Sequence, residues 1–146
     1  SNAAVSTIND ELSQPTAKTR VARKVKIPMR DGARLVADIV FPEPAGKFPT
    51  VLIRTPSRRP VVTDWIKRGE FFAARGYAVV VQATRGREDS EGEWQPWMNE
   101  RKDGYDTIDW ISRQSWSDGN VGMLGGSYLG EAQLLAAAEG HPALKL

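Results

Sequence analysis

The chain has 146 residues, 40% of them hydrophobic and 26% charged, which is enough for one globular domain with a buried core. It has no cysteine and one histidine, so disulfides are excluded, and we expect neither a metal site nor a cofactor. A net charge of +2 does not favour nucleic-acid binding, and no apolar run approaches the roughly 20 residues of a membrane-spanning helix, so we expect neither partner.

The first 19 residues are polar and show no periodic pattern. Ser1, Asn2 and Ala3 resemble a remnant of cloning, and the rest of residues 1–19 is expected to be a flexible lead-in. The folded domain is therefore expected over residues 20–146. The cellular compartment stays open, because a signal peptide that had been removed would leave no trace.

Two alternating segments predict an antiparallel hairpin at the start of the domain. Val21–Ile27 and Arg34–Phe41 alternate apolar and polar residues, and Arg30–Gly32 between them is typical of a turn. A short apolar strand is expected at Thr50–Arg54, where Pro56 ends it.

The middle of the chain predicts two helices around a buried strand. A helix is expected from Thr63 or Asp64 to Arg75, with Gly76 as its C-terminal stop and Gly69 as an unfavourable interior residue. Tyr77–Gln82 is a β-branched run typical of a strand buried on both faces. Asn99–Arg113 is amphipathic and predicts the second helix.

The last quarter predicts a turn, a strand and a helix. These are expected at Ser117–Asn120, Val121–Gly126 and Tyr128–Glu139, with a further strand beginning at Ala143–Leu146. The order of elements favours an α/β fold, in which parallel strands with helices on both faces follow the hairpin.

The sequence V-G-M-L-G-G-S-Y-L-G at Val121–Gly130 predicts a strand that turns sharply into a helix and presents Ser127. A serine at such a turn is exposed above the sheet, beside backbone N–H groups that stabilise an oxyanion. A dinucleotide-binding turn is disfavoured, because Ser127 stands where a glycine must admit the pyrophosphate. The pattern therefore indicates a nucleophilic serine.

The partners of such a serine are not evident in the chain. No aspartate follows Ser127, and the glutamates that do, Glu131 and Glu139, fall within the expected helix. His141 lies 14 positions after Ser127, at the far end of that helix, about 20 Å away at 1.5 Å per residue. We therefore expect neither the base nor the acid of a catalytic triad among these residues.

Several ordered motifs resemble the cocaine-esterase / X-prolyl dipeptidyl-peptidase-like family of α/β-hydrolases. The motifs, in chain order, are Met29–Gly32 with Leu35–Asp38, Arg54–Pro56, Gly76–Val80, Thr84–Gly86 with Ser90–Glu93, Asp106–Ile111, Trp116–Gly122 and Gly125–Gly130. The resemblance implies that residues 20–146 are the N-terminal part of an α/β-hydrolase domain, a truncated version of that fold. It also implies that the acid and the histidine of the triad lie beyond residue 146.

The resemblance also implies roles for individual residues. Ser127 would be the nucleophile, and the backbone N–H of Tyr128 would be one oxyanion donor. Ser57 stands where the family carries a tyrosine whose hydroxyl is the second donor, and a serine is a shorter and weaker candidate. Ala83 stands where the family usually carries an acidic residue.

Other charged and aromatic residues have simpler interpretations. Residues 85–93 are expected to form a solvated loop in which Arg85 pairs with a carboxylate. Trp94, Trp97, Trp110 and Trp116 are expected to pack in the core or at its rim, in preference to forming a cation-binding cage. Arg54, Arg58 and Arg59 suggest an anion-binding patch, but a solvated loop is the expected interpretation.

Two functions are compatible with these patterns. The first is a serine hydrolase that acts on small esters or amides through a Ser127 acyl-enzyme, and that is nearly inactive without the remaining triad residues. The alternative is a non-catalytic α/β module that forms a homo-oligomer through an open sheet edge.

Overall fold

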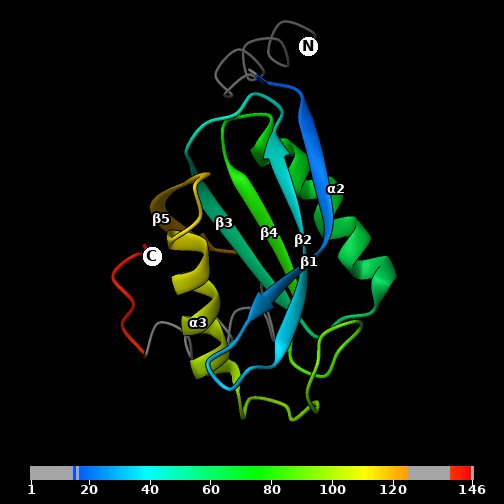
Figure 1. Ribbon diagram of the computed structural model, residues 1–146. Helices are drawn as coiled ribbons and strands as arrows, with labels where there is room; N and C mark the ends of the chain where they lie inside the picture. The colour runs from blue at the N-terminus through cyan, green and yellow to red at the C-terminus, as the bar shows by residue number, and fades with distance from the viewer. Residues whose placement is uncertain (1–14, 16, 125–138, 146) are drawn as a thin grey trace, which may run out of the picture.

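The computed structural model describes residues 15, 17–124 and 139–145 as one mixed sheet with a helix on each face (Figure 1). The strand order is β1-β2-β4-β3-β5. The strands are β1 (Thr19–Pro28), β2 (Arg34–Pro42), β3 (Phe48–Thr55), β4 (Ala78–Ala83) and β5 (Ser117–Met123). The helices are α2 (Arg59–Ala73) and α3 (Glu100–Ser112).

The strand pairing changes from antiparallel to parallel along the chain. β1 and β2 form the predicted hairpin, whose register shifts between Ala22 and Val25, and β2 pairs antiparallel with β4. β3 then lies parallel to both β4 and β5. The N-terminal hairpin and the following parallel strands were both predicted and are confirmed.

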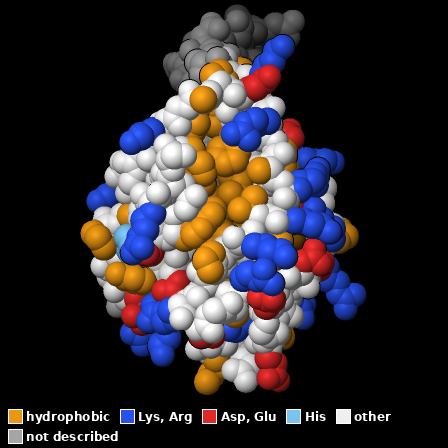
Figure 2. Space-filling view, viewed as in Figure 1, with side chains coloured by type: hydrophobic (Ala, Val, Ile, Leu, Met, Phe, Trp, Pro, Cys, Tyr) orange, Lys and Arg blue, Asp and Glu red, His pale blue; other side chains and the backbone are white. Residues whose placement is uncertain are grey.

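Each face of the sheet has its own apolar core. On one face, Ile108 and Ile111 of α3 pack against Leu52 and Val80. On the other face, Val62 and Ile66 of α2 pack with buried valines and Ile53 of the sheet. Helices on both faces exclude water from the central strands, as expected for parallel strands. Figure 2 shows hydrophobic side chains gathered over the middle of the molecule and charged residues around them.

The prediction for α2 was correct in kind but wrong at its start. The helix begins at Arg59, with Pro60 in its first turn, and neither Thr63 nor Asp64 caps it. Gly69 has a packing role, since a Cβ there would lie 3.0 Å from Cγ1 of Val79. The glycine therefore allows the helix to lie close to the sheet, which offsets its poor helix propensity.

The predicted turn at Ser117–Asn120 is instead the first part of β5. Ser117 is the register partner of Phe48, so pairing with β3 begins earlier than the local turn pattern indicates. Tertiary pairing therefore overrides a local Asp-Gly-Asn signal. The predicted helix at Tyr128–Glu139 lies almost entirely outside the described residues.

At one position, the outer edge of β5 pairs with the segment at residues 143–145. Val121 donates its N–H to the carbonyl of Ala143 at 2.8 Å and accepts from the N–H of Lys145 at 2.7 Å. The isolated parallel bridge between Val121 and Leu144 agrees with the strand start predicted there. The homo-oligomer predicted at an open sheet edge stays a prediction.

Neither described helix is long and apolar enough to cross a membrane.

Candidate active site at the carboxyl end of the sheet

The carboxyl ends of the three parallel strands meet at one edge of the sheet. β3 ends at Thr55 and β4 ends at Ala83, which are register partners. Just after β5, Leu124 donates its N–H to the carbonyl of Leu52 at 3.1 Å. Ligands of α/β sheets bind outside the carboxyl ends of strands, so this edge is the candidate site. The predicted nucleophile Ser127 and the oxyanion donor Tyr128 follow Leu124 closely in the chain but lie outside the described residues.

Ser57 lies on the loop that leaves β3 at this edge. Its backbone N–H bonds Oγ1 of Thr55 at 3.1 Å, and the residue is half-buried. Arg87 holds the same loop, because its Nε donates to the carbonyl of Pro56 at 2.8 Å. Ser57 is therefore fixed at the edge where its predicted role requires it, and that role itself stays a prediction.

A charged network is buried directly beneath the edge. Nε of Arg54 donates to Oε1 of Gln82 at 2.7 Å, and Nη1 of Arg54 forms an ion pair with Glu100 at the start of α3. The hydroxyl of Thr107 donates to the same Gln82 oxygen at 3.1 Å. The interpretation of Arg54 as a solvated loop residue was wrong, because its side chain is fully buried.

A signal for this network was present in the sequence. Arg54 and Gln82 each follow a run of three apolar residues, V-L-I and V-V-V, in strands that lie side by side. A polar residue at the end of such a run falls on a buried register position. Glu100 could not be found in this way, since it comes from a helix 46 residues away along the chain.

Arg85 makes the ion pairs that the sequence predicted. Its guanidinium donates to Asp103 at 2.8 and 2.9 Å and contacts Asp31 at 2.8 Å. The hydrogen bond that Arg85 donates to Asp103 raises the pKa of Arg85, although burial opposes the shift. The hydrogen bond from Arg85 in turn lowers the pKa of Asp31. The loop after β4 is thus tied to α3 and to the β1–β2 turn.

The same loop depends on a glycine at a close approach. Gly86 has φ +72°, and a Cβ there would lie 2.2 Å from the backbone N of Trp94. No side chain fits at that distance, so the loop folds back on itself only with glycine here. The contact places residue 94 next to the carboxyl end of β4.

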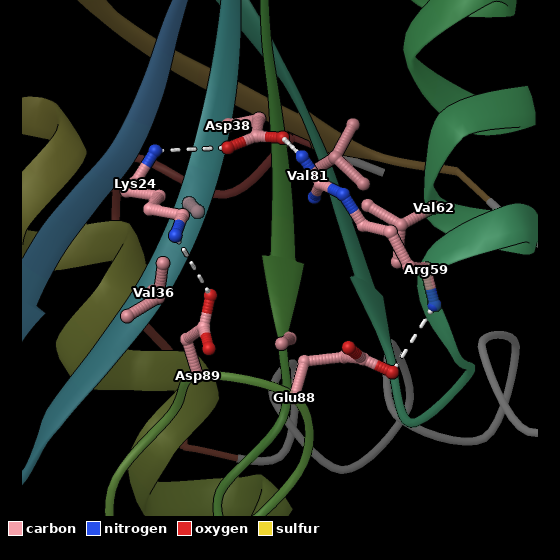
Figure 3. Close-up of a pocket in the computed structure, with 10 residues that line it drawn as sticks. Lys24, Val36, Asp38, Arg59, Val62, Val81, Glu88 and Asp89 are labelled. Carbon is pink, nitrogen blue, oxygen red and sulfur yellow. Dashed lines mark hydrogen bonds and ion pairs between the residues drawn. The ribbon is translucent and has the colours of Figure 1, made fainter.

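A second charged cluster lies on the α2 face near the same end of the sheet (Figure 3). Asp38 is buried and accepts hydrogen bonds from the backbone N–H of Lys24 at 2.9 Å and from Arg59 at 2.7 Å. Glu88 accepts the N–H of Arg59 at 3.1 Å, at the start of α2. The small space beside them is about 30 Å³, which suits a water molecule and not a substrate.

His141 is held by both of its ring nitrogens. Nδ1 lies 3.0 Å from the backbone N–H of Ala143, and Nε2 lies 3.1 Å from Oδ1 of Asp109. Because the backbone N–H donates to Nδ1, the neutral ring carries its proton on Nε2 and donates it to Asp109. This arrangement gives His141 a structural role and leaves no ring nitrogen free to accept a proton from a nucleophile. Over the described ranges, no group of three His, Asp or Glu side chains could hold a metal ion.

The strand order, the helix on each face of the sheet and the candidate site at the carboxyl ends of the parallel strands define an α/β-hydrolase fold. The chain matches the X-Pro dipeptidyl-peptidase (S15) family over residues 31–146. It is 45% identical to the cocaine esterase of Rhodococcus sp. (strain MB1 Bresler) over 132 residues, which is 86% of this chain and 22% of that enzyme. The chain therefore belongs to the S15 family, as its motifs predicted.

Solved structures of similar proteins have the same architecture. An aminopeptidase from a marine-sediment Thaumarchaeota archaeon superposes with a TM-score of 0.76 at 30% identity, over 92% of this chain and 26% of that one. A CocE/NonD family hydrolase from Staphylococcus aureus gives a TM-score of 0.75 at 28% identity, over 93% and 30%. The chain thus spans about a quarter of the length of these relatives, and its relatives are esterases and other hydrolases.

Proposed function

We propose that this chain contributes the nucleophile of a serine hydrolase that cleaves small esters or amides. The Oγ of Ser127 attacks the substrate carbonyl carbon, the C–O or C–N bond breaks, and the leaving group takes up a proton. Water then cleaves the acyl–Ser127 bond and regenerates the hydroxyl. Family membership supports the reaction class.

The observation that carries the proposal is the end of β5. The N–H of Leu124 still bonds the carbonyl of Leu52 on β3, so the described chain reaches the carboxyl edge of the sheet three residues before Ser127. The Gly-Gly-Ser-Tyr sequence that follows is the pattern of a nucleophile at a strand-to-helix turn. The backbone N–H of Tyr128 would stabilise the oxyanion, and Ser57 is the candidate for a second donor.

The proton-accepting histidine and its acid are not supplied by the residues that the structure describes. His141 is engaged on both nitrogens, and its partner Asp109 lies on α3 and also pairs with Arg113. A serine without a base is a poor nucleophile, so this chain by itself should hydrolyse esters at near-background rates. Robust ester turnover that Ser127→Ala abolishes would overturn this claim.

The proposal is tested by prolonged covalent labelling with an excess of a fluorophosphonate, because the oxyanion donors alone leave residual reactivity at a nucleophile whose base is missing. The Oγ–P bond forms and the P–F bond breaks, so the chain gains one phosphonyl group and releases fluoride and a proton. Mass spectrometry of the digested protein is expected to find the group on Ser127, and Ser127→Ala should remove it. Ser90→Ala is the control, because Ser90 is buried and bonds the carbonyl of Ala83. Labelling spread over several serines, or absent at Ser127, would contradict the proposal.

A further inference from the structure

A groove lies at the amino ends of the parallel strands, at the opposite end of the sheet from the candidate active site (Figure 1). Its walls are the loop at residues 42–48, Ser115 and Trp116 just before β5, and Arg20 of β1. We call it the Trp116 groove. Its volume is about 460 Å³, within the range of about 300–1,000 Å³ that is typical of small-molecule sites.

The aromatic walls of the Trp116 groove are held in place by their neighbours. The N–H of Phe48 donates to the carbonyl of Trp116 at 2.8 Å, which ties the start of β3 to the start of β5. The ring of Trp116 meets the ring of the buried Phe41 edge-on, with 5.0 Å between the ring centres. At Gly46 a Cβ would lie 3.2 Å from the Phe48 ring, so the loop lies closely against that ring. A wall fixed in this way loses little conformational freedom when a ligand binds.

Two cations line the Trp116 groove without a carboxylate partner. Neither Arg20 nor Lys47 forms an ion pair with any of the residues that the structure describes. The guanidinium of Arg20 lies 4.4 Å from the ring centre of Phe41, its register partner on β2, and this contact holds it at the rim. Glu43, the acidic residue of the loop, does not line the groove. The groove is therefore positively charged and suits an anion.

We infer that the Trp116 groove binds a small aromatic carboxylate. The ring of the ligand lies against Trp116 and Phe48, and its carboxylate accepts hydrogen bonds from Arg20. The planar fork of a guanidinium matches the two oxygens of one carboxylate, and Lys47 adds a second positive charge. The inference does not depend on the proposed hydrolase function, because these residues lie at the end of the sheet away from the carboxyl edge.

Titration of the chain with 2-naphthoate, followed by ligand-observed NMR, tests the chemistry of the ligand. We expect 2-naphthoate to bind about tenfold more tightly than 2-naphthylmethanol, which has the same rings without the charge, since a hydrogen bond to a charged group supplies about that factor. It should also bind more tightly than cyclohexanecarboxylate, which has the charge without the aromatic ring. Absent binding, or equal affinity within either pair, would overturn the inference. Tighter binding of 2-naphthyl phosphate would overturn the choice of a carboxylate.

Substitution of the two cations tests the place of binding. Arg20→Gln should weaken 2-naphthoate binding about tenfold, and Lys47→Gln about threefold, because the exposed ammonium group stays hydrated. The matched control is Arg68→Gln. Arg68 also lies over an aromatic ring, 5.0 Å from the ring centre of Trp65 on α2, and it too forms no ion pair within the described ranges. The control should leave binding unchanged. An unchanged affinity in Arg20→Gln, or an equal loss in Arg68→Gln, would overturn the inference.

The indole N–H signals of the unmodified chain locate the ligand without relying on a variant's stability. The chain has five tryptophans, and their indole N–H groups give separate NMR signals, of which Trp116→Phe identifies one by its disappearance. We expect 2-naphthoate to shift the Trp116 signal more than any other indole signal. A larger shift at another tryptophan would place the ligand elsewhere and overturn the inference, while fluorophosphonate labelling of Ser127 would still decide the proposed function.

Discussion

Arg54 and Asp38 are charged residues buried near the same end of the sheet, one on each face, but their partners differ. Arg54 is enclosed by Glu100 and Gln82, which are buried themselves. Asp38 is bound by side chains that reach solvent, since Arg59 is 47% exposed and Arg23 is 64% exposed. A partner that loses Asp38 can return to water, whereas Arg54 cannot. The loss of one partner should therefore cost much more on the α3 face than on the α2 face.

Glu100→Gln is expected to have the largest effect on stability. The substitution leaves the Arg54 guanidinium buried without its countercharge, which typically costs about 3–5 kcal/mol. Urea unfolding followed by circular dichroism measures the loss. A cost below about 1 kcal/mol would mean that water reaches Arg54 in solution, and would remove the contrast between the two faces.

The double variant Arg54→Met, Glu100→Leu separates charge from packing. Replacing a whole buried ion pair with apolar residues of similar volume is often neutral or stabilising. We expect the double variant to recover most of the stability that Glu100→Gln loses. A double variant that is as unstable as the single one would show that the pair acts through shape and not through charge.

Asp38→Asn should be milder. The asparagine carbonyl oxygen can still accept the N–H of Lys24, and Arg59 can rehydrate once its partner is neutral. We expect a cost of about 1–2 kcal/mol, near that of one hydrogen bond to a charged group. The same urea experiment measures it, with Arg59→Ala as the matched variant. A cost equal to that of Glu100→Gln would show that the exposed partners of Asp38 do not relax into water.

The two faces also show what local patterns can predict. The β-branched run at residues 77–82 predicted β4 to within one residue, because a buried run of this kind needs no distant partner to identify it. The start of α2 was missed because no side chain of the helix caps it. Its first N–H instead bonds Glu88, which is 29 residues away along the chain. Long-range contacts of this kind leave no local signal.

Local patterns likewise predicted only part of the candidate site. The serine turn and the family motifs are local, so they predicted the class of protein. Trp97 is 40% exposed, which the expected position at the rim of the core allows. Its positive φ was not predicted, because the local Pro-Trp pair does not specify it.

Asp31→Asn is expected to have the smallest effect, because this partner of Arg85 is 55% exposed and Asp103 remains beside the guanidinium. The hydrogen bond from Arg85 lowers the pKa of Asp31, so the ionised carboxylate stabilises the fold. That contribution is complete above the ordinary pKa of about 4 and is lost as the pH falls through the lower, folded-state value. At pH 7 the Tm of the unmodified chain should therefore be slightly higher than that of Asp31→Asn. The two Tm values should converge near pH 2–3. A difference that stays constant, or that grows towards acid, would show that the carboxylate at residue 31 does not act through Arg85.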